Sequence, residues 1–454
     1  MKPESTLICA EQHTPQVITC SLSDQLLKRL PVSVVFFYPE TLQQQPLMKA
    51  LKQVLSDFPL FAGRFKQAGD QLLLDCNNAG VSFSVQDDDL TLKQALHQLP
   101  SIERKRFVDK VDAKRSLIQQ SPILTIKLTN FSGGGSVLGL CWHHSTGDMH
   151  TFMSFMMAWS AVTNGKDYTK PLIVHDRMAY LEEHLKNKKI EQQHKEKDNR
   201  PSITRYLNTK ALIQLLFYLV GKARRKTMVR AYFSESELQS MQQAMSEQAG
   251  RRLSINDALC AHLLALITDL DDSQQQTRTL AIVINYRAVL QLPKNLLGNL
   301  SDAINIMTHL EDSPVDVAKQ IRESVNTFKE KHFGFFATKQ YVEQHGGMRK
   351  IRRFMNNGTD PIKRTLLISN LSGSGVYRIA FAGAKPFYFT LFRDYPLPWI
   401  CSLTKGPLNQ GLIYSAPLPN ALARLLTKNL PRLHQYRDLK EALPDCVQQL
   451  PWLM

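Results

Sequence analysis

The sequence predicts an α/β fold of two domains, with mixed sheets flanked by helices. Its 454 residues exceed what one ordinary hydrophobic core organises and suffice for two domains of about 200 residues each. Short apolar runs typical of buried strands alternate with amphipathic helical patterns. The composition changes sharply at Leu185, where a strongly polar stretch begins. We therefore expect an N-terminal domain over residues 1–185, a crossover segment over 186–229 and a C-terminal domain over 230–454.

Composition narrows the class of protein. Hydrophobic residues make up 43% of the chain and charged residues 21%, which is typical of a globular protein. No apolar run reaches the roughly 18 residues that a membrane span needs, and the first residues show no signal-peptide pattern. The seven cysteines are scattered and form no C-x-x-C pair, which argues against a disulfide framework and a structural zinc site. We expect a cytoplasmic protein without a metal centre.

The net charge of +16 raises the question of an anionic partner. Basic residues concentrate in the ranges 186–200, 222–226 and 349–363. The favoured interpretation is a linker and solvated surfaces, and the alternative is a site for a phosphate-bearing small molecule. A nucleic-acid partner is less favoured, because the clusters are not interleaved with stacking aromatics and belong to no recognisable nucleic-acid-binding module.

The first 180 residues mix strands and helices without an internal repeat. The apolar run 34–38 predicts a buried strand that Pro39 ends, and 46–57 predicts an amphipathic helix. Further strands are expected at 72–75, 81–85, 123–128 and 137–142, with a polar helix at 91–98. The glycines at 133–135 predict a turn that pairs the last two strands.

Residues 141–148, Cys-Trp-His-His-Ser-Thr-Gly-Asp, carry the most reactive group of side chains. They end an apolar strand and precede a helical pattern in which Phe152, Phe155 and Trp159 recur at spacings of three and four. An imidazole and a carboxylate four residues apart at such a turn, His144 and Asp148, are poorly explained by packing alone. We place the chemistry here.

An apolar run follows the polar stretch 186–200, which we interpret as an exposed linker. Residues 211–220, Ala-Leu-Ile-Gln-Leu-Leu-Phe-Tyr-Leu-Val, are too few to cross a bilayer. The favoured prediction is a helix in the hydrophobic core. The alternative is an apolar flap that touches a membrane or an apolar acceptor.

The C-terminal domain shows clear helix starts. Ser234 with Glu237 forms a capping-box pattern, and Ser254 with Asp257 caps another helix with an apolar face. A central strand is expected at 280–284, helices at 314–329, 341–354 and 419–430, and strands at 365–369 and 377–381.

Several segments of the chain, in the order in which they occur, resemble motifs of the acyl-CoA-dependent acyltransferases of the BAHD family. These enzymes share a fold with chloramphenicol acetyltransferase. The matching segments are 57–64 (Asp-Phe-Pro-Leu-Phe-Ala-Gly-Arg), 76–81 (Cys-Asn-Asn-Ala-Gly-Val), the H-x-x-x-D motif from His144 to Asp148, 254–259 (Ser-Ile-Asn-Asp-Ala-Leu), and Arg287 followed by Gly298 and Asn299. The resemblance covers nearly the whole chain. It implies a two-domain fold with the active site in a channel at the domain interface.

The resemblance also implies roles for these residues. His144 would be the general base that takes the proton of a hydroxyl or amine acceptor, with direct attack on acyl-CoA and no acyl-enzyme. Neutral imidazole suits this role, because its ordinary pKa of about 6.5 leaves it a free base at pH 7. Asp148 would be structural and paired with Arg287 of the other domain, because a lone buried charge is costly. Ser369 and Asn370 are the candidates for contacting the thioester oxygen.

Acyl-CoA is expected as a co-substrate, and no tightly bound cofactor is expected. The chain has no Walker or dinucleotide glycine-rich loop, so basic side chains on the rim of the channel would hold CoA. The candidates for contacting CoA are Ser254, Lys385, Lys222, Arg224, Arg349 and Arg352. The other partner would be a small-molecule acceptor, and we expect the enzyme to act as a monomer.

The sequence departs from the family pattern at three places, one of which is Ser369-Asn370-Leu371, where T-S-W is common in the family. Met149 stands where the family has glycine after the motif's Asp, and the second family motif, D-F-G-W-G, corresponds to Ala-Phe-Ala-Gly-Ala at 380–384. Two alternatives therefore stay open. One is a condensation-domain-like enzyme with a carrier-bound donor, suggested by the pair His143 and His144. The other is a catalytically silent binding protein on the same fold.

Overall fold

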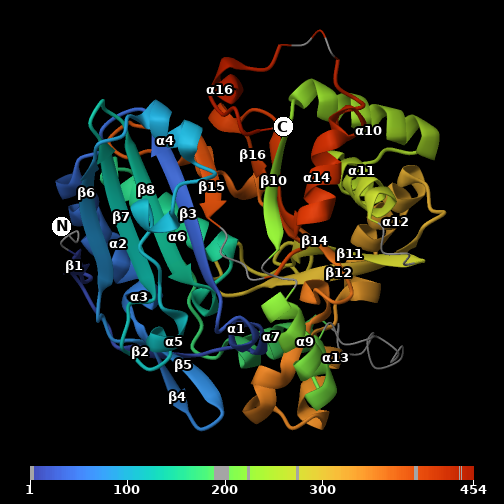
Figure 1. The fold of residues 1–454 in the computed structure, drawn as a ribbon. Helices are drawn as coiled ribbons and strands as arrows, with labels where there is room; N and C mark the ends of the chain where they lie inside the picture. Colours follow the sequence, from blue (N-terminus) through green and yellow to red (C-terminus); the bar gives the residue numbers. More distant parts are fainter. Residues whose placement is uncertain are drawn as a thin grey trace.

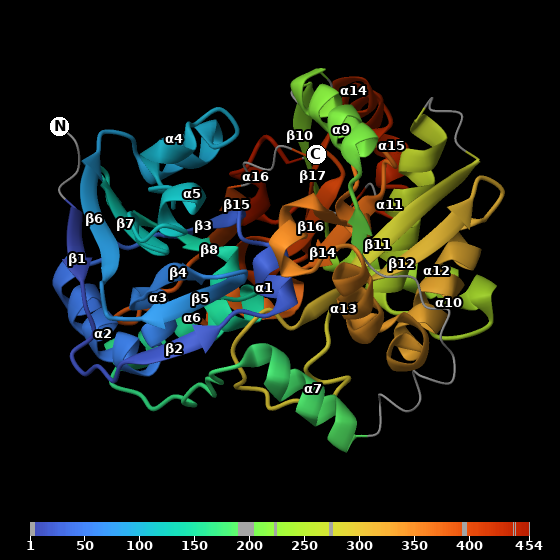
Figure 2. The ribbon, with the colours of Figure 1, turned by 90° about the horizontal axis from the view of Figure 1, so that it is seen from below.

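Two six-stranded mixed sheets with flanking helices form the centre of the computed structural model (Figure 1). The structure describes residues 5–188, 204–221, 225–271, 276–392, 397–438, 440 and 442–453. Figure 2 shows the two halves side by side, with helices α1 (Leu22–Leu26) and α7 (Arg177–Asn187) between them. The fold is therefore α/β with two domains, as predicted.

The first sheet has the strand order β1-β6-β7-β8-β3-β15. Its strands are β1 (Ser5–Ile8), β6 (Val81–Asp88), β7 (Leu124–Phe131), β8 (Ser136–His143), β3 (Pro31–Tyr38) and β15 (Tyr388–Phe392). Strands β6 and β7 run parallel, and the other neighbours run antiparallel. The strands predicted at 34–38, 81–85, 123–128 and 137–142 are confirmed, and the glycines at 133–135 lie in the turn between β7 and β8.

Strand β15 comes from the C-terminal half of the chain but lies at the edge of the first sheet. It pairs antiparallel with β3, with Phe389 opposite Phe36. The rings of these two residues lie 4.9 Å apart in the first hydrophobic core, which Phe381 also joins. The first sheet is thus completed by residues that follow the crossover segment by a long stretch of chain.

The second sheet has the order β10-β17-β16-β14-β11-β12. Its strands are β10 (Lys226–Phe233), β17 (Leu412–Pro419), β16 (Ile400–Lys405), β14 (Leu366–Asn370), β11 (Thr277–Asn285) and β12 (Ser301–His309). The strands predicted at 280–284 and 365–369 are confirmed as β11 and β14. Two small sheets join β2 (Gln16–Thr19), β5 (Gln71–Cys76) and β4 (Arg64–Ala68), and β9 (Thr204–Tyr206) with β13 (Phe354–Asn356).

Helices bury their apolar faces against both sheets. The remaining helices are α2 (Gln44–Asp57), α3 (Pro59–Ala62), α4 (Leu92–Gln98), α5 (Ala113–Ser116), α6 (Met149–Thr163), α9 (Thr209–Gly221), α10 (Glu235–Ala249), α11 (Ile255–Leu270), α12 (Pro314–Asn326), α13 (Phe335–Gln344), α14 (Asn420–Lys428), α15 (Leu430–Leu433) and α16 (Asp445–Gln448). Helices α2 and α6 contribute Leu51, Leu55 and Phe155 to the first core, and α11 contributes Leu259 and Leu263 to the second. None of the described helices is both long enough and apolar enough to cross a bilayer.

Two predicted elements are wrong. The helix expected at 341–354 is interrupted, because Gly346 and Gly347 take φ values of +100° and +65°, which end α13 and start a short 3-10 helix, η4 (Met348–Arg353). The strand expected at 377–381 is instead a 3-10 turn over Val376–Arg378 followed by a tight bridge between Phe381 and Ala384.

The prediction of a core helix at 211–220 is also wrong. These residues form most of α9, but Leu215 is its only buried residue. The large side chains of Phe217 and Val220 are 75% and 65% exposed. Residues 189–203, which include most of the predicted linker, lie outside the described residues.

Candidate active site

The turn that carries His144 links the end of β8 to the start of α6. His144–Thr146 form one 3-10 turn, and Asp148 is the N-cap of α6. The indole nitrogen of Trp142 donates to the carbonyl of Gly147 at 3.1 Å, and its ring stacks on Phe152 at 4.0 Å. A Cβ atom at Gly147 would lie 2.4 Å from Cγ2 of Thr151, so the close approach of turn and helix requires glycine.

The two neighbouring histidines differ in environment. His143 is fully buried, its ring lies tilted against that of Phe65 at 4.6 Å, and it accepts a hydrogen bond from the backbone N–H of Ser145. Burial lowers the pKa of His143 to about 3. His144 keeps partial exposure; burial lowers its pKa below the ordinary value, and Asp148, Asn299 and Asp24 oppose that shift. Both imidazoles are neutral at pH 7, and of the two residues His144 is the one that retains some exposed surface.

Asp148 forms a buried ion pair with Arg287 of the second domain. Its carboxylate accepts from Nη1 of Arg287 at 2.8 Å, from Nη2 at 3.2 Å, and from the backbone N–H groups of Thr151 and Leu300. Burial alone would raise the pKa of Asp148, but the Arg287 charge and these hydrogen bonds outweigh it and lower the pKa. The carboxylate therefore fastens the turn to the second domain, and its hydrogen bonds go to groups other than the imidazole.

Asn299 holds the imidazole of His144. Its Nδ2 lies 2.7 Å from Oδ1 of Asp24 and 2.8 Å from the carbonyl oxygen of His144, and both of these atoms can only accept. This arrangement fixes the orientation of the amide and turns Oδ1 towards Nδ1 of His144, 3.1 Å away. Nδ1 therefore carries the proton, and Nε2 carries the lone pair that can accept one.

Asp24 and Arg177 form a second buried ion pair behind Asn299. Nη1 of Arg177 lies 2.9 Å from Oδ2 of Asp24, and Asp24 is fully buried in the capping box of α1. Arg177 also donates to the carbonyl of Thr146, and Ser145 donates its hydroxyl to the carbonyl of Asp24. Helices α1 and α7 are thus joined directly to the turn that presents His144.

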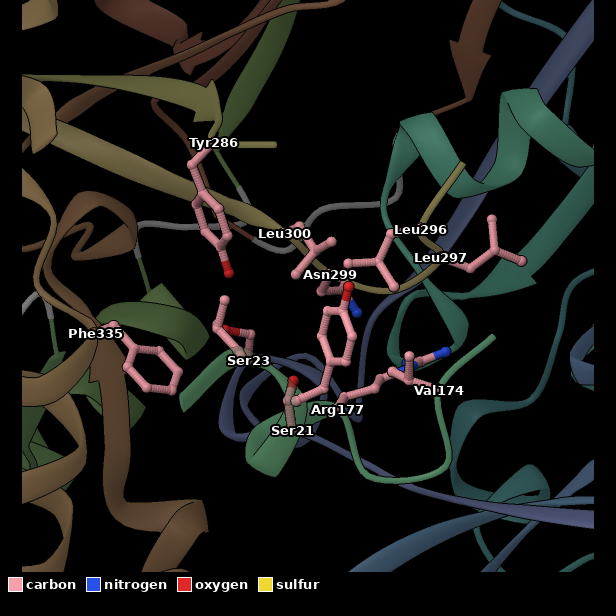
Figure 3. Close-up of a pocket in the computed structure, with 12 residues that line it drawn as sticks. Ser21, Ser23, Val174, Arg177, Tyr286, Leu296, Leu297, Asn299, Leu300 and Phe335 are labelled. Carbon is pink, nitrogen blue, oxygen red and sulfur yellow. The ribbon is translucent and has the colours of Figure 1, made fainter. Parts of the chain in front are cut away.

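A small cavity borders this network at the domain interface (Figure 3). Its wall is mostly apolar, with Leu296, Leu300 and Phe335 from the second domain, and Arg177 and Asn299 contribute polar groups. Figure 3 shows Tyr286 and Asn299 among the side chains that line this space; they come from the two ends of the loop between β11 and β12. Asn299 lines the cavity, whereas His144 is not part of its wall.

The predicted oxyanion candidates end strand β14. The amide of Asn370 donates to Oδ1 of Asn256 at 2.8 Å, and its oxygen accepts from the backbone and hydroxyl of Ser372. Ser369 is partly exposed and pairs in the sheet with Ser402. The side chain of Asn370 therefore holds the chain turn after β14, and Ser369 is the better placed of the two to meet a ligand.

Lys385 lines an open cavity of about 500 Å³ together with Arg378 and Lys405. Lys405 is paired with Glu235 at 2.7 Å, whereas Arg378 and Lys385 are exposed and form no ion pair with a described residue. Gly373 and Gly375 form part of the wall, so the backbone is accessible there. Cations and bare backbone in one cavity form a site suited to phosphate groups.

The turn at 380–384, which replaces the second family motif, is fastened to the first domain. The carbonyl of Ala380 accepts from the hydroxyl of Ser160 and the amide of Asn164, and Gly383 N–H donates to Asn164. These α6 residues lie near the opposite end of the helix from His144, about 20 Å along its axis. The turn is thus held against α6 without the motif's Asp and Trp.

Three other candidate CoA ligands within the described residues, Ser254, Arg349 and Arg352, do not line this cavity. Ser254 caps α11, where its hydroxyl accepts from Asp257 N–H. Arg349 and Arg352 are exposed in η4, which packs beside α1. Lys222 and Arg224 lie in 222–224, outside the described residues. Of the four candidates that the structure describes, it therefore brings Lys385 alone to the cavity.

Several site residues, Asn299, Asp24 and Arg378 among them, were not assigned a role from the sequence. Asn299 belongs to a family segment, but its contact with His144 spans 155 residues. Asp24 ends the S-x-x-D pattern Ser21-Leu-Ser-Asp24, a helix-start signal that could have marked it. Arg378 has no local signal, because its place at the cavity depends on the fold.

Comparison with known proteins identifies the family. The model of the Transferase family matches residues 2–393. The chain belongs to the BAHD acyltransferases. A limonoid 21-O-acetyltransferase from Melia azedarach, a curated BAHD relative, is 24% identical over 75% of this chain and 76% of its own length. A hydroxycinnamoyltransferase from Narcissus pseudonarcissus is 29% identical over 37% of this chain, which is 40% of that relative.

Solved BAHD structures share the fold. Vinorine synthase superposes with a TM-score of 0.68 at 19% identity, covering 93% of this chain and 95% of that enzyme. TRI101 of F. sporotrichioides, determined with coenzyme A and T-2, gives a TM-score of 0.69 at 16% identity over 91% of this chain and 97% of that one. The fold expected from the resemblance is confirmed.

Proposed function

We propose that this protein transfers an acyl group from acyl-CoA to a hydroxyl group of a small molecule, with an amine as the alternative acceptor. The observation that carries the proposal is the contact between His144 and Asn299. It assigns the proton to Nδ1 and leaves Nε2 as a base on an imidazole whose pKa is lowered, in a residue that retains some exposed surface. The chemistry of a general base requires this protonation state near neutral pH.

In the reaction, Nε2 of His144 removes the proton of the acceptor hydroxyl as its oxygen attacks the thioester carbonyl. The thioester oxygen takes the negative charge, and Ser369 at the end of β14 is the proposed hydrogen-bond donor to it. Collapse of the tetrahedral intermediate breaks the C–S bond, and the departing thiolate receives the proton from the His144 imidazolium. Attack is direct, so no residue of the chain is acylated.

The cavity lined by Arg378, Lys385 and Lys405 is the proposed site for the phosphates of CoA. It flanks the turn that α6 fastens at the end opposite His144. The phosphates and the thioester of CoA lie at opposite ends of an extended arm, so a separation of this kind between cations and base suits the molecule. Arg349 and Arg352 are outside this site.

The relatives support the choice of acceptor. The limonoid 21-O-acetyltransferase is named for transfer to oxygen, and the hydroxycinnamoyltransferase for transfer of an aromatic acyl group. Family membership favours free acyl-CoA over a carrier-bound donor. His144, Asp148, Asn299 and Arg287 all come from one chain, so a monomer suffices for the proposed reaction.

Thiol release from a panel of acetyl-, hexanoyl- and p-coumaroyl-CoA, offered with mixed alcohols and amines, tests this proposal. We expect release without any carrier protein, and mass spectrometry should identify the acylated product. His144→Ala should lower the rate by about 10²–10⁴-fold. His150→Ala is the matched control, because its imidazole lies in the first turn of α6, close in sequence to His144, and contacts the carbonyl of Lys294.

Equal rates for wild type and His144→Ala would contradict the assigned base. Calorimetry with CoA tests the remaining alternative, a catalytically silent binding protein. Binding of CoA without turnover across the panel would identify a silent binding protein on this fold.

A further inference from the structure

Helix α9 carries a continuous apolar stripe on its exposed side. Ile213, Leu216, Phe217 and Val220 follow the i, i+3, i+4, i+7 spacing that places side chains on one face of a helix. They are 48%, 52%, 75% and 65% exposed, and Phe217 is the most exposed large hydrophobic residue of the described chain. Large apolar side chains grouped in this way mark an interaction surface.

The rest of α9 holds the helix against the second domain. Leu215 on the opposite side is buried, and Tyr218 is half-buried. Before the helix, β9 pairs with β13, and Leu207 N–H donates to the carbonyl of Arg353 at 2.6 Å. Figures 1 and 2 place α9 at the margin of the molecule in two perpendicular views. The stripe therefore faces outwards from a helix whose inward side carries Leu215 and whose start follows the β9–β13 pairing.

Exposed cations lie close to the stripe in the chain. Lys210 is exposed in the first turn of α9, and Arg225 is exposed just after the helix in the chain. At the foot of the helix, the ammonium group of Lys350 lies 5.9 Å from the ring centroid of Tyr206. The sequence contains no Asp or Glu from residue 199 to residue 234. An apolar face with exposed cations close to it in the chain, in a stretch of sequence without acidic residues, matches an anionic lipid surface.

We propose that α9 docks on an anionic lipid bilayer, with the stripe at the boundary between headgroups and acyl chains and with Lys210, Arg225 and Lys350 near the lipid phosphates. The helix lies in the plane of the membrane surface and does not cross it. This inference does not depend on the acyl-transfer reaction, because it rests only on the surface of α9 and its neighbours.

A second copy of the chain is a poorer occupant of the same face. A two-fold contact through α9 would bring Lys210 and Arg225 of one copy near the same cations of the other. The chain as a whole also carries a net charge of +16, which opposes self-association. Anionic lipid relieves this repulsion, whereas a second copy adds to it.

Co-sedimentation with vesicles tests the proposal on the full-length protein. We expect binding to vesicles of phosphatidylcholine with phosphatidylglycerol, much weaker binding to phosphatidylcholine alone, and a loss of binding as salt rises. The double substitution Leu216→Ser with Phe217→Ser should weaken binding at least about tenfold, because two apolar side chains leave the interface. Lys210→Glu with Arg225→Glu should abolish the preference for anionic vesicles.

Met307→Ser is the matched control, since Met307 is 64% exposed on β12, away from α9. It should bind vesicles like wild type. All variants alter exposed side chains, so their melting temperatures should equal that of wild type. As a second measurement, Phe217→Trp in the otherwise intact chain should show a blue-shifted emission with anionic vesicles.

The proposal is overturned if wild type stays in the supernatant with anionic vesicles, or if Leu216→Ser with Phe217→Ser sediments like wild type. An unshifted emission of Phe217→Trp has the same consequence. A wild-type dimer that the double substitution converts to monomer would assign the stripe to a second copy instead.

Discussion

Nδ1 of His144 donates a hydrogen bond to Oδ1 of Asn299 across the domain interface, at 3.1 Å. The direction of this bond is set by Asp24, whose carboxylate accepts from the amide nitrogen of Asn299 on the other side. The protonation site of the proposed base is therefore determined by residues of both halves of the chain. A change in Asn299 should act on the reaction through His144, without touching the substrate.

We expect Asn299→Ala to lower kcat by about three- to tenfold, because a hydrogen bond of this kind contributes about 0.5–1.5 kcal/mol. The dissociation constant for CoA should not change, because the cations of the proposed CoA cavity lie elsewhere. Steady-state kinetics and calorimetry with CoA measure the two quantities. Asn295→Ala, on the same loop, is the control. An unchanged kcat for Asn299→Ala would show that the amide of Asn299 does not position His144 for the reaction.

The pH dependence of activity should report the lowered pKa of His144. Burial favours the neutral imidazole, so the pKa of His144 lies below the ordinary histidine pKa of about 6.5. A protonated imidazole cannot accept the acceptor's proton, and kcat/KM should therefore fall on the acid side with a midpoint below pH 6.5. A midpoint above that value would contradict the assignment.

The free energy of unfolding should decrease as the pH is lowered, because of His143. Burial lowers its pKa to about 3, whereas in the unfolded chain it titrates near 6.5. Between these pH values the unfolded state binds one more proton than the folded state. The free energy of unfolding should therefore decrease by up to about 1.4 kcal/mol for each unit by which the pH is lowered. Urea denaturation from pH 7 to pH 5 measures the slope. His143→Asn, which keeps an acceptor for Ser145 N–H, should have a smaller slope.

Arg287→Ala should lower activity and folding yield together. It leaves the carboxylate of Asp148 buried without its cation, a change that costs about 3–5 kcal/mol in buried pairs. Chemical denaturation and soluble yield are the measurements. Glu323→Gln breaks the surface pair with Lys331, whose side chains are 56% and 63% exposed, and should cost about 1 kcal/mol or less. Equal losses for the two variants would remove the special role of the buried pair.

Charge reversal in the proposed CoA cavity should raise the KM for acyl-CoA. For Arg378→Glu or Lys385→Glu we expect about a tenfold increase or more, since a charge-assisted hydrogen bond is replaced by repulsion. The melting temperature should not change, because both side chains are exposed. Lys428→Glu, an exposed cation at the end of α14, is the control. A wild-type KM in both cavity variants would place the phosphates elsewhere.

Local patterns predicted the elements whose neighbours in sequence are also their neighbours in space. The hairpin of β7 and β8 and the caps at Ser234 and Ser254 are of this kind. The helix expected at 341–354 failed at Gly346 and Gly347, where backbone freedom outweighed the apolar spacing. At 211–220 the failure was one of burial: hydrophobicity alone did not show that only Leu215 faces inwards.

For the candidate site, the pairing of Asp148 with Arg287 could be expected from the resemblance, and the structure contains it. The contact of Asn299 with His144 and the approach of Asp24 and Arg177 could not, because each depends on how distant segments pack. The gathering of Arg378, Lys385 and Lys405 likewise needs the fold. Site residues that belong to one turn can be predicted from the sequence, whereas site residues that the packing of the two domains brings together cannot.

The pairing of β15 with β3 has a consequence for synthesis of the chain. During translation the first sheet stays incomplete until residue 392 has left the ribosome, long after its other strands have formed. The edge of β3, with the apolar residues Val34 and Phe36, waits unpaired during that time and can recruit other strands. Expression of the N-terminal half alone should therefore yield aggregates, and co-expression with the C-terminal half should rescue it.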